Sequence, residues 1–283
     1  MANYFFTTQK AVNNMKKIVR AIRVDIARAL FSGRFLLSII LLLGWMLFNS
    51  SHYLFDESLR ADLSAANILH YATTDSVNLA LLLLPIATIP YSGSYNLDYD
   101  SNFLNQAIGR VGLRAYSFSK FFVTALSSFL SAIISMVIFL FILYLLGFKF
   151  LACTIDTGGY TILAVKGLPI LYYFVRFMIT GLTCSLAAVF SLMISAYVSN
   201  SYVCLMAPLV GYYLSVILLS ILMDIFPALW SLLSLFNLSY NFFYQLSDDF
   251  LTFSITWTIV YLTTLTALFG ICFNWRLRRE YAQ

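Results

Sequence analysis

The sequence has little charge for its length. Of its 283 residues, 10% are Asp, Glu, Lys or Arg, while 61% are hydrophobic and the mean hydropathy is +0.86. Soluble domains carry about 25% charged residues, because polar side chains have to face water over the whole surface. This shortage argues against an ordinary soluble enzyme. It indicates that lipid is the solvent for much of the surface.

The motifs of several catalytic and metal-binding classes are also missing. No GxxxxGK[ST] stretch is present to hold a nucleotide phosphate, and no HExxH or HxxEH is present to hold zinc. The two histidines, His52 and His70, lack metal-ligand spacing, and the cysteines show no CxxC pattern. We therefore expect that the chain is not an enzyme, and that it has no catalytic, cofactor-binding or metal-binding residue.

What the sequence does contain is a series of long uncharged intervals. A membrane crossing takes about 20 apolar residues of helix. The longest interval, 177–223, divides into two at Ser199-Asn200-Ser201. Because these intervals hold no acidic residue, a carrier driven by protons or sodium is disfavoured. The sequence predicts a single all-α polytopic transmembrane domain over 1–283 with six transmembrane helices. The predicted spans are 35–55, 76–95, 121–147, 177–198, 203–223 and 250–273.

The basic residues predict which side the termini face. Loops rich in Lys and Arg stay in the cytoplasm. The first 34 residues contain seven basic residues against Asp25, and three arginines against Glu280 follow the last span. Both termini are therefore predicted to be cytoplasmic, which requires an even number of spans. The acidic first and last outer loops agree, whereas Lys149 and Lys166 in the second outer loop depart mildly from the trend.

The segment 225–247 is apolar and uncharged, but Pro227 interrupts it and Asn237, Asn241 and Gln245 dilute it. A seventh span there would put the C-terminus outside, against the charge pattern. Backbone at membrane depth persists only when it is folded as helix or buried in protein. We interpret the segment as a re-entrant outer helical hairpin before the last span. A hairpin lying on the outer leaflet is the alternative.

Residues 12–32 combine apolar and basic positions at helical spacing. Apolar side chains recur every three or four residues from Val12 to Leu30. This pattern predicts an N-terminal amphipathic interface helix at the inner face of the membrane. It would act either as a passive anchor or as a lever that a cytoplasmic partner moves. Its basic residues are Lys16, Lys17, Arg20, Arg23 and Arg28.

The inner loop between the second and third predicted spans has the most distinctive sequence, DYDSNFLNQAIGRVGLRAYSFSK. Two acidic residues precede a short helical piece around 103–108, and basic residues follow it. Acidic residues suit a helix N-terminus and basic residues suit its C-terminus. The pattern predicts a short cytoplasmic helix within 98–118, with an ordinary solvated loop as the alternative. The charged residues are Asp98, Asp100, Arg110, Arg114 and Lys120.

Arg176 borders the fourth predicted span. If that helix meets the cytoplasm near Ser199, Arg176 lies 23 residues above this point, or about 34 Å at 1.5 Å per residue. We therefore expect Arg176 to anchor the helix at the outer interface. As an alternative, it pairs with an acidic residue such as Asp224 around an outer vestibule.

Taken in order, these features resemble the permease subunits of type-2 ABC transporters. The resemblance covers nearly the whole chain: the amphipathic entry helix, six spans with both ends inside, the inner loop and the apolar outer segment. The inner loop contributes an acidic start and the turn Arg110-Val111-Gly112-Leu113-Arg114 that leads to Tyr116. One departure is that Asp98 and Asp100 stand where many members of the family carry glutamates.

The resemblance implies partners and roles. The permease would dimerise with a second copy or a paralogue, and two separate ABC ATPase subunits would bind ATP and Mg²⁺. The ATPase-coupling residues would be Asp98, Asp100, Arg110 and Arg114, the two aspartates capping the coupling helix. The chain would lie in the plasma membrane of a bacterium as a multi-pass protein.

The aromatic-rich and nearly uncharged spans favour export of a hydrophobic or amphipathic substrate, either a peptide or a drug-like molecule. By the same resemblance, the substrate would pass along spans two and five. No nucleic-acid partner is expected. The alternative is an ATPase-independent membrane accessory or peptide-immunity protein, which would not need a coupling helix.

Overall fold

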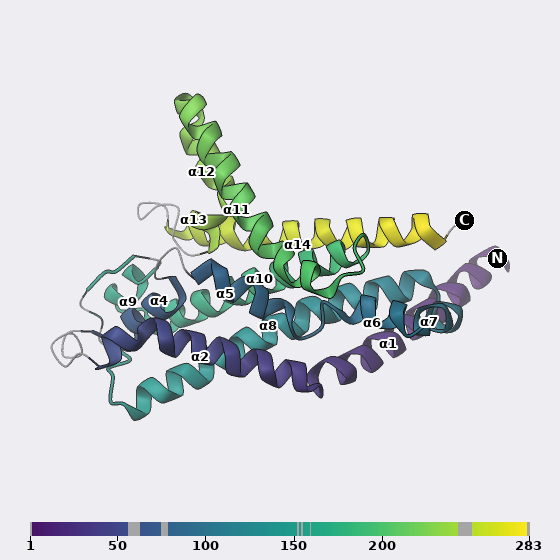
Figure 1. Ribbon diagram of the computed structural model, residues 1–283, viewed down its shortest axis with the longest axis horizontal. Coiled ribbons are helices and arrows are strands. Elements are labelled where there is room, and N and C mark those ends of the chain that lie inside the picture. The colour runs from purple at the N-terminus through teal and green to yellow at the C-terminus, as the bar shows by residue number, and fades with distance from the viewer. Residues whose placement is uncertain are drawn as a thin grey trace.

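The structure is a computed structural model that describes residues 2–55, 63–74, 79–151, 153, 155–158, 160–242 and 251–281. Within these ranges all regular elements are helices and no strand is present, which confirms the all-α fold class. Figure 1 shows an elongated bundle whose N- and C-terminal ends lie at the same end of its long axis.

Across the described ranges, five helices are long and apolar enough to cross a membrane. They are α2 (Gly33–Phe55), α8 (Leu113–Leu145), α10 (Pro169–Ser195), α11 (Ser201–Ile225) and α14 (Leu251–Tyr281). Each overlaps one of the predicted spans. α8 and α14 extend past the predicted limits into sequence that carries Lys and Arg, because a helix continues for as long as its backbone hydrogen bonds do, whatever the polarity of its side chains.

The remaining predicted span, 76–95, is not one continuous helix. α5 (Leu79–Thr88) has 10 residues, and a turn separates it from α6 (Ser94–Asp100). α5 ends just before Ile89-Pro90, because proline lacks a backbone N–H and disfavours helical backbone in the residue before it. The ten described residues of α5 extend about 15 Å, half of the hydrocarbon core, and residues 75–78 lie outside the described residues. α4 (Ala65–Thr74), which precedes α5, was predicted as part of an outer loop.

α10 lies at the centre of the bundle and follows the single turn α9 (Ile162–Val165). It packs against α5, α8, α11 and α14. Of the 18 consecutive residues that form its most apolar stretch, 67% are buried. Small and hydroxyl-bearing residues permit this close approach. Ser185 Oγ of α10 donates to Ala125 O of α8 at 2.9 Å, and Ser128 Oγ of α8 donates to Ala87 O of α5 at 2.7 Å. These hydroxyls therefore hold neighbouring helices together.

α11 leaves the bundle at an angle (Figure 1). Of the 18 consecutive residues that form its most apolar stretch, only 11% are buried. The outer segment that follows it consists of η1 (Pro227–Leu229), α12 (Trp230–Phe236) and α13 (Leu238–Phe242). Trp257 Nε1 and Tyr261 OH of α14 donate to Leu235 O and Phe236 O, each at 2.9 Å. Two short helices thus occur where the hairpin was predicted. Its re-entrant position stays a prediction, and Gln245 lies outside the described residues.

α1 (Ala2–Leu30) is longer than the predicted interface helix and packs along α8. From Met15 onward, where its side chains are described, the buried residues of α1 are Ala21, Asp25 and Ala29, which lie four residues apart. The two alanines let the α1 backbone approach α8 closely. Met15 and Val19, which belong to the predicted apolar stripe, are 62% and 64% exposed. The stripe is therefore divided: Ile22 and Ile26 pack against a buried cluster with Tyr91 and Val123, while its N-terminal part is exposed. Insertion of this part into the membrane interface stays a prediction.

Candidate functional site

A buried cluster of four charged residues joins α1, α6 and α8. Lys120 Nζ of α8 lies 2.7 Å from Asp98 Oδ2 of α6 and 3.4 Å from Asp25 Oδ1 of α1. Arg28 Nη2 of α1 donates to Asp98 Oδ1 at 2.8 Å, and Arg28 Nη1 lies 3.7 Å from Asp25 Oδ1. Each cation contacts both carboxylates. We call this group, with two positive and two negative charges, the joint cluster.

Three hydroxyl groups complete the joint cluster. Tyr91 OH donates to Asp25 Oδ1 and accepts from Lys120 Nζ at 2.9 Å. Tyr116 OH donates to Asp98 Oδ2 at 3.0 Å, and Ser119 Oγ donates to Asp25 Oδ2 at 2.6 Å. A buried ion pair stabilises a protein only when further hydrogen bonds satisfy its remaining polar atoms. The joint cluster meets this condition at both carboxylates.

Helical spacing brings the members of the joint cluster together. Asp25 and Arg28 lie three residues apart on α1, so their side chains share one face. Tyr116, Ser119 and Lys120 lie three and four residues apart on α8, and they also share a face. Lys120 is 0% exposed and Asp98 1% exposed, whereas the Arg28 side chain is 41% exposed. Arg28 therefore covers the outer side of the cluster.

The joint cluster shifts the pKa values of Asp98 and Arg28. Burial acts to raise the pKa of Asp98, but the charge of Lys120 and the hydrogen bonds from Arg28 and Lys120 outweigh it, so the pKa lies below its usual value of 3.8. Partial burial likewise acts to lower the pKa of Arg28, but the hydrogen bond to Asp98, together with the electrostatic interactions with Tyr91, Asp98 and Asp25, outweighs it, so this pKa is raised. Asp98 and Arg28 therefore form a charged pair at neutral pH.

A helix, α7 (Phe103–Val111), is present where the short helix within 98–118 was predicted, and its coupling role stays a prediction. The prediction that Asp98 and Asp100 cap it is wrong, because both residues lie in α6 and the N-cap of α7 is Asn102, which makes no side-chain cap bond. Asn102 instead adopts a left-handed backbone conformation with φ of 55°, which separates α6 from α7. Asp98 is buried in the joint cluster, while Asp100 is exposed.

Most of the other predicted coupling and interface residues stay on the surface. Arg110 lies in the last turn of α7 and Arg114 in the first turn of α8, and both are exposed. Gly112, with φ of 87°, forms the bend between them. Among the basic residues of the interface helix, Arg28 alone enters the joint cluster. The remaining ones, Lys16, Lys17, Arg20 and Arg23, are exposed on α1.

The prediction that Arg176 anchors α10 at the membrane interface is wrong. Arg176 is 1% exposed, and its Nε donates to Thr73 Oγ1 of α4 at 2.9 Å. The reason is α4, which packs against α10 and covers this position. Asp224 is exposed near the end of α11, and no described contact joins it to Arg176.

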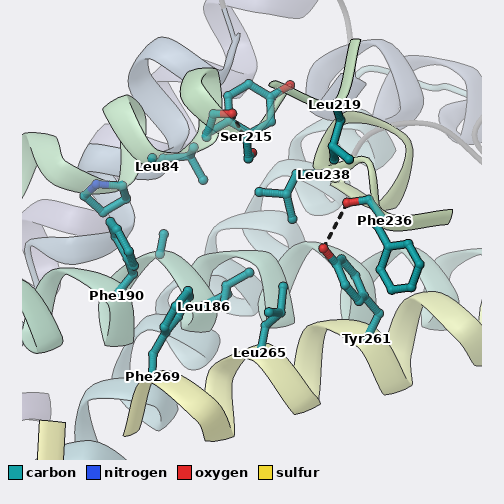
Figure 2. Close-up of a pocket in the computed structure, with 14 residues that line it drawn as sticks. Leu84, Leu186, Phe190, Ser215, Leu219, Phe236, Leu238, Tyr261, Leu265 and Phe269 are labelled. Atoms are coloured by element: carbon teal, nitrogen blue, oxygen red, sulfur yellow. Dashed lines mark hydrogen bonds between the residues drawn. The ribbon is translucent and has the colours of Figure 1, made fainter. Parts of the chain in front are cut away.

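An apolar cavity of about 270 Å³ lies among α5, α10, α11, α14 and the outer segment. Figure 2 shows leucine and phenylalanine side chains around it. Two of its polar groups bond to backbone: Tyr261 OH donates to Phe236 O at 2.9 Å, and Ser215 Oγ donates to Tyr212 O at 2.7 Å. Such a lining suits an apolar group rather than a charged one. The labelled lining residues are Leu84, Leu186, Phe190, Ser215, Leu219, Phe236, Leu238, Tyr261, Leu265 and Phe269.

Several residues of the joint cluster are not evident from the sequence pattern. In the sequence, Asp25 is one charged residue of the N-terminal region and Lys120 is one charged residue of the inner loop. Tyr91 and Tyr116 do not differ from the many other aromatic residues. One signal was available for Asp25, the single acidic residue in a strongly basic helix. Pairing it with Lys120, 95 residues later in the sequence, requires the packing of α1 on α8.

The arrangement therefore consists of a charge-balanced joint among three helices and an apolar cavity elsewhere in the bundle. All four cysteines are free, and the described residues hold no group of three or more His, Cys, Asp or Glu side chains that could bind a metal.

No family model, no curated protein and no solved structure matches the chain.

Proposed function

We propose that the chain is the membrane-spanning permease subunit of an ABC transporter, which exports a hydrophobic or amphipathic substrate with ATP hydrolysed by a separate subunit. The observation that carries this proposal is the joint cluster. It fastens the entry helix α1 and the inner-loop helix α6 to the start of α8. A simple solvated loop would not need such a network.

The joint cluster suits the transmission of force. α7 follows α6 after two residues, of which Asn102 is left-handed, and it leads directly into α8 through Gly112. A partner that pushes on the exposed face of α7 would therefore move α6, α1 and α8 together, because the buried ion pairs resist separation. Arg110 and Arg114 lie on the exposed surface of this unit, where an acidic ATPase surface would contact them.

Six crossings with cytoplasmic termini are part of the proposal. Five helices are long enough to cross, and Figure 1 shows α4, α5 and α6 following one another along the long axis of the bundle. We assign the sixth crossing to this interrupted path. Interrupted helices occur at membrane depth where protein buries them, and the described side chains of α5 are mostly buried. The termini at one end of the bundle agree with an even number of crossings.

The apolar cavity supports the proposed substrate class. Leu84 belongs to the path assigned as the second crossing, and Tyr212 and Leu219 belong to α11, the fifth. The substrate was expected to follow these two spans. A volume of about 270 Å³ accommodates a side chain or a short acyl segment, so it would hold part of an amphipathic molecule rather than all of it.

The decisive experiment compares ATPase association in two charge-reversed variants. The chain is co-expressed with the products of its neighbouring genes and purified through a tag in mild detergent. In the Arg110→Glu/Arg114→Glu variant we expect at least a tenfold loss of co-purified ATPase and of substrate-stimulated hydrolysis, because two contacts to an acidic surface become repulsive. The matched control is Lys149→Glu/Lys166→Glu, which reverses two exposed charges in the predicted outer loop and should leave association intact.

Unchanged association in the Arg110→Glu/Arg114→Glu variant would contradict the assigned docking surface. If the unmodified chain brings no ATPase with it, the transporter proposal fails. The ATPase-independent accessory or peptide-immunity role would then take its place.

A further inference from the structure

A second cavity, of about 500 Å³, lies where α1, the α7–α8 bend and α14 meet. Three basic residues from three different helices line it: Lys17 of α1, Arg114 of α8 and Arg278 of α14. No acidic residue is among the lining residues. We call this cavity the basic cavity. It is distinct from the joint cluster, whose two cations are paired with carboxylates.

The three cations of the basic cavity make no ion pair within the described ranges, where the four ion-pair contacts all belong to the joint cluster. The backbone adds to the same field. Gly112, Leu113, Arg114 and Ala115 line the cavity at the start of α8, a helix of 33 residues whose N-cap has no side-chain bond. The first N–H groups of a helix lack partners within the helix and favour an anion. The cavity therefore has the charge and the donors to bind a phosphate group.

Apolar surface continues from the basic cavity along both long helices. Phe118 and Phe122 follow Arg114 at spacings of four on α8, and they are 46% and 39% exposed and stacked. Trp275 and Ile271 precede Arg278 by three and seven residues on α14, and they are 58% and 62% exposed. On both helices, these exposed apolar residues lie between the arginine and the middle of the helix.

α8 and α14 are in direct contact beside the basic cavity. Ser117 Oγ of α8 donates to Asn274 Oδ1 of α14 at 2.9 Å. One turn further into the span, the ring of Phe121 packs against Gly270 of α14 so closely that a Cβ there would lie 2.4 Å from it. The basic cavity thus lies at the end of the α8–α14 contact, where the two helices begin to pack closely. Exposed apolar side chains lie on both helices beside this contact. A phosphate with two acyl chains has this same arrangement of charge and apolar surface.

From this geometry, we propose that the basic cavity binds the headgroup of an anionic phospholipid from the cytoplasmic leaflet, with the acyl chains lying along α8 and α14. The inference requires the membrane orientation but not the ATPase partner. Its test alters Lys17 and Arg278, to which the proposed function assigns no contact with the ATPase, and leaves Arg114, which both proposals use, unchanged. The two proposals therefore fail independently.

The test measures lipid binding by the full chain purified alone. Phosphatidylglycerol and phosphatidylcholine with identical acyl chains are titrated in turn, and lipids retained per chain are counted by native mass spectrometry. We expect one phosphatidylglycerol to bind at least tenfold more tightly than phosphatidylcholine. A basic residue near an anionic headgroup contributes about 1 kcal/mol, or roughly fivefold in affinity. The Lys17→Gln/Arg278→Gln variant should therefore bind phosphatidylglycerol about 25-fold more weakly.

The matched control is Arg20→Gln/Arg23→Gln, which removes two exposed charges of α1 that do not line the basic cavity. It should retain the tight phosphatidylglycerol. Equal losses in the two variants would show diffuse surface attraction and overturn the proposal, as would a wild-type chain without lipid preference. Inorganic phosphate is titrated as a third probe. If it displaces phosphatidylglycerol at millimolar concentration, the site is one for free anions and the lipid assignment is overturned.

Discussion

At the residue scale, the burial of Lys120 is the most demanding feature of the molecule. Its ammonium group is 0% exposed at the start of an apolar helix. Removing such a charge from water costs several kcal/mol even after the protein relaxes. Asp98 and Asp25 offset this cost, and Tyr91 accepts a further hydrogen bond. Arg28 contacts the same carboxylates but is partly solvated, so its loss is easier to accommodate.

We expect Lys120→Met to lower the free energy of unfolding by about 3–5 kcal/mol, because it leaves two buried carboxylates with one cation. Arg28→Gln should cost about 1 kcal/mol, since water replaces part of the lost contact. The double variant Lys120→Met/Asp98→Asn should recover part of the loss, because it again balances the charges. Unfolding in mixed micelles with increasing dodecyl sulfate measures all three. A neutral Lys120→Met would refute the importance assigned to the joint cluster.

At the element scale, glycine and aromatic residues set the distance between α8 and its neighbours. A Cβ built on Gly270 of α14 would lie 2.4 Å from the Phe121 ring, and one on Gly181 of α10 would lie 2.6 Å from the Phe129 ring. Both rings belong to α8 and stand where a methyl group would be. Small residues permit the close approach of helices that packing in lipid requires. These two contacts hold α8 against α10 and α14.

Gly270→Ala should destabilise the protein by about 1–3 kcal/mol, because the added methyl group forces the Phe121 ring to move within a packed seam. Gly44→Ala on α2 is the matched control, since nothing lies within 4 Å of its Cβ position. There the better helix propensity of alanine should be neutral or stabilise by about 0.5–1 kcal/mol. The same dodecyl sulfate titration compares them. Equal effects at the two glycines would contradict the close packing of α8 on α14.

At the scale of the whole molecule, orientation depends on whether the interrupted path of α4, α5 and α6 crosses the membrane. If it does, the exposed face of α1 and the exposed face of α7 lie on the same side. A path that does not cross would put them on opposite sides, although α1 packs against α7 within the bundle. Between α7 and the end of α11 the chain runs through three long helices, α8, α10 and α11. If each of them crosses the membrane, Asp224 lies on the opposite side of the membrane from Arg110 in either case.

Cysteine labelling decides the number of crossings. Lys16→Cys, Arg110→Cys and Asp224→Cys are made separately in a Cys153→Ser/Cys272→Ala background, because Cys184 and Cys204 are buried. We expect a membrane-impermeant maleimide to label position 224 in intact cells. Positions 16 and 110 should react only after permeabilisation. Labelling of 16 and 110 from opposite sides would contradict the sixth crossing, and labelling of 224 from inside would reverse the orientation.

Local features of the sequence were sufficient for most elements. Uncharged intervals located the five long helices, and the charge pattern around 103–108 located α7, because helix length and polarity are properties of neighbouring residues. The same reasoning did not find the break before α6, since apolarity alone does not ensure a continuous helix. It also missed α4 as a helix, and with it the burial of Arg176.

The sequence by itself determined the all-α class, the apolar character of the spans and the unequal distribution of charge. These depend on composition and on spacing along the chain. Only the tertiary structure decided which charges meet: Asp25 with Lys120, Arg28 with Asp98, and Lys17 with Arg114 and Arg278 around the basic cavity. The physical reason is that electrostatic energy depends on distance and burial in space, and packing brings together side chains that lie far apart in the sequence.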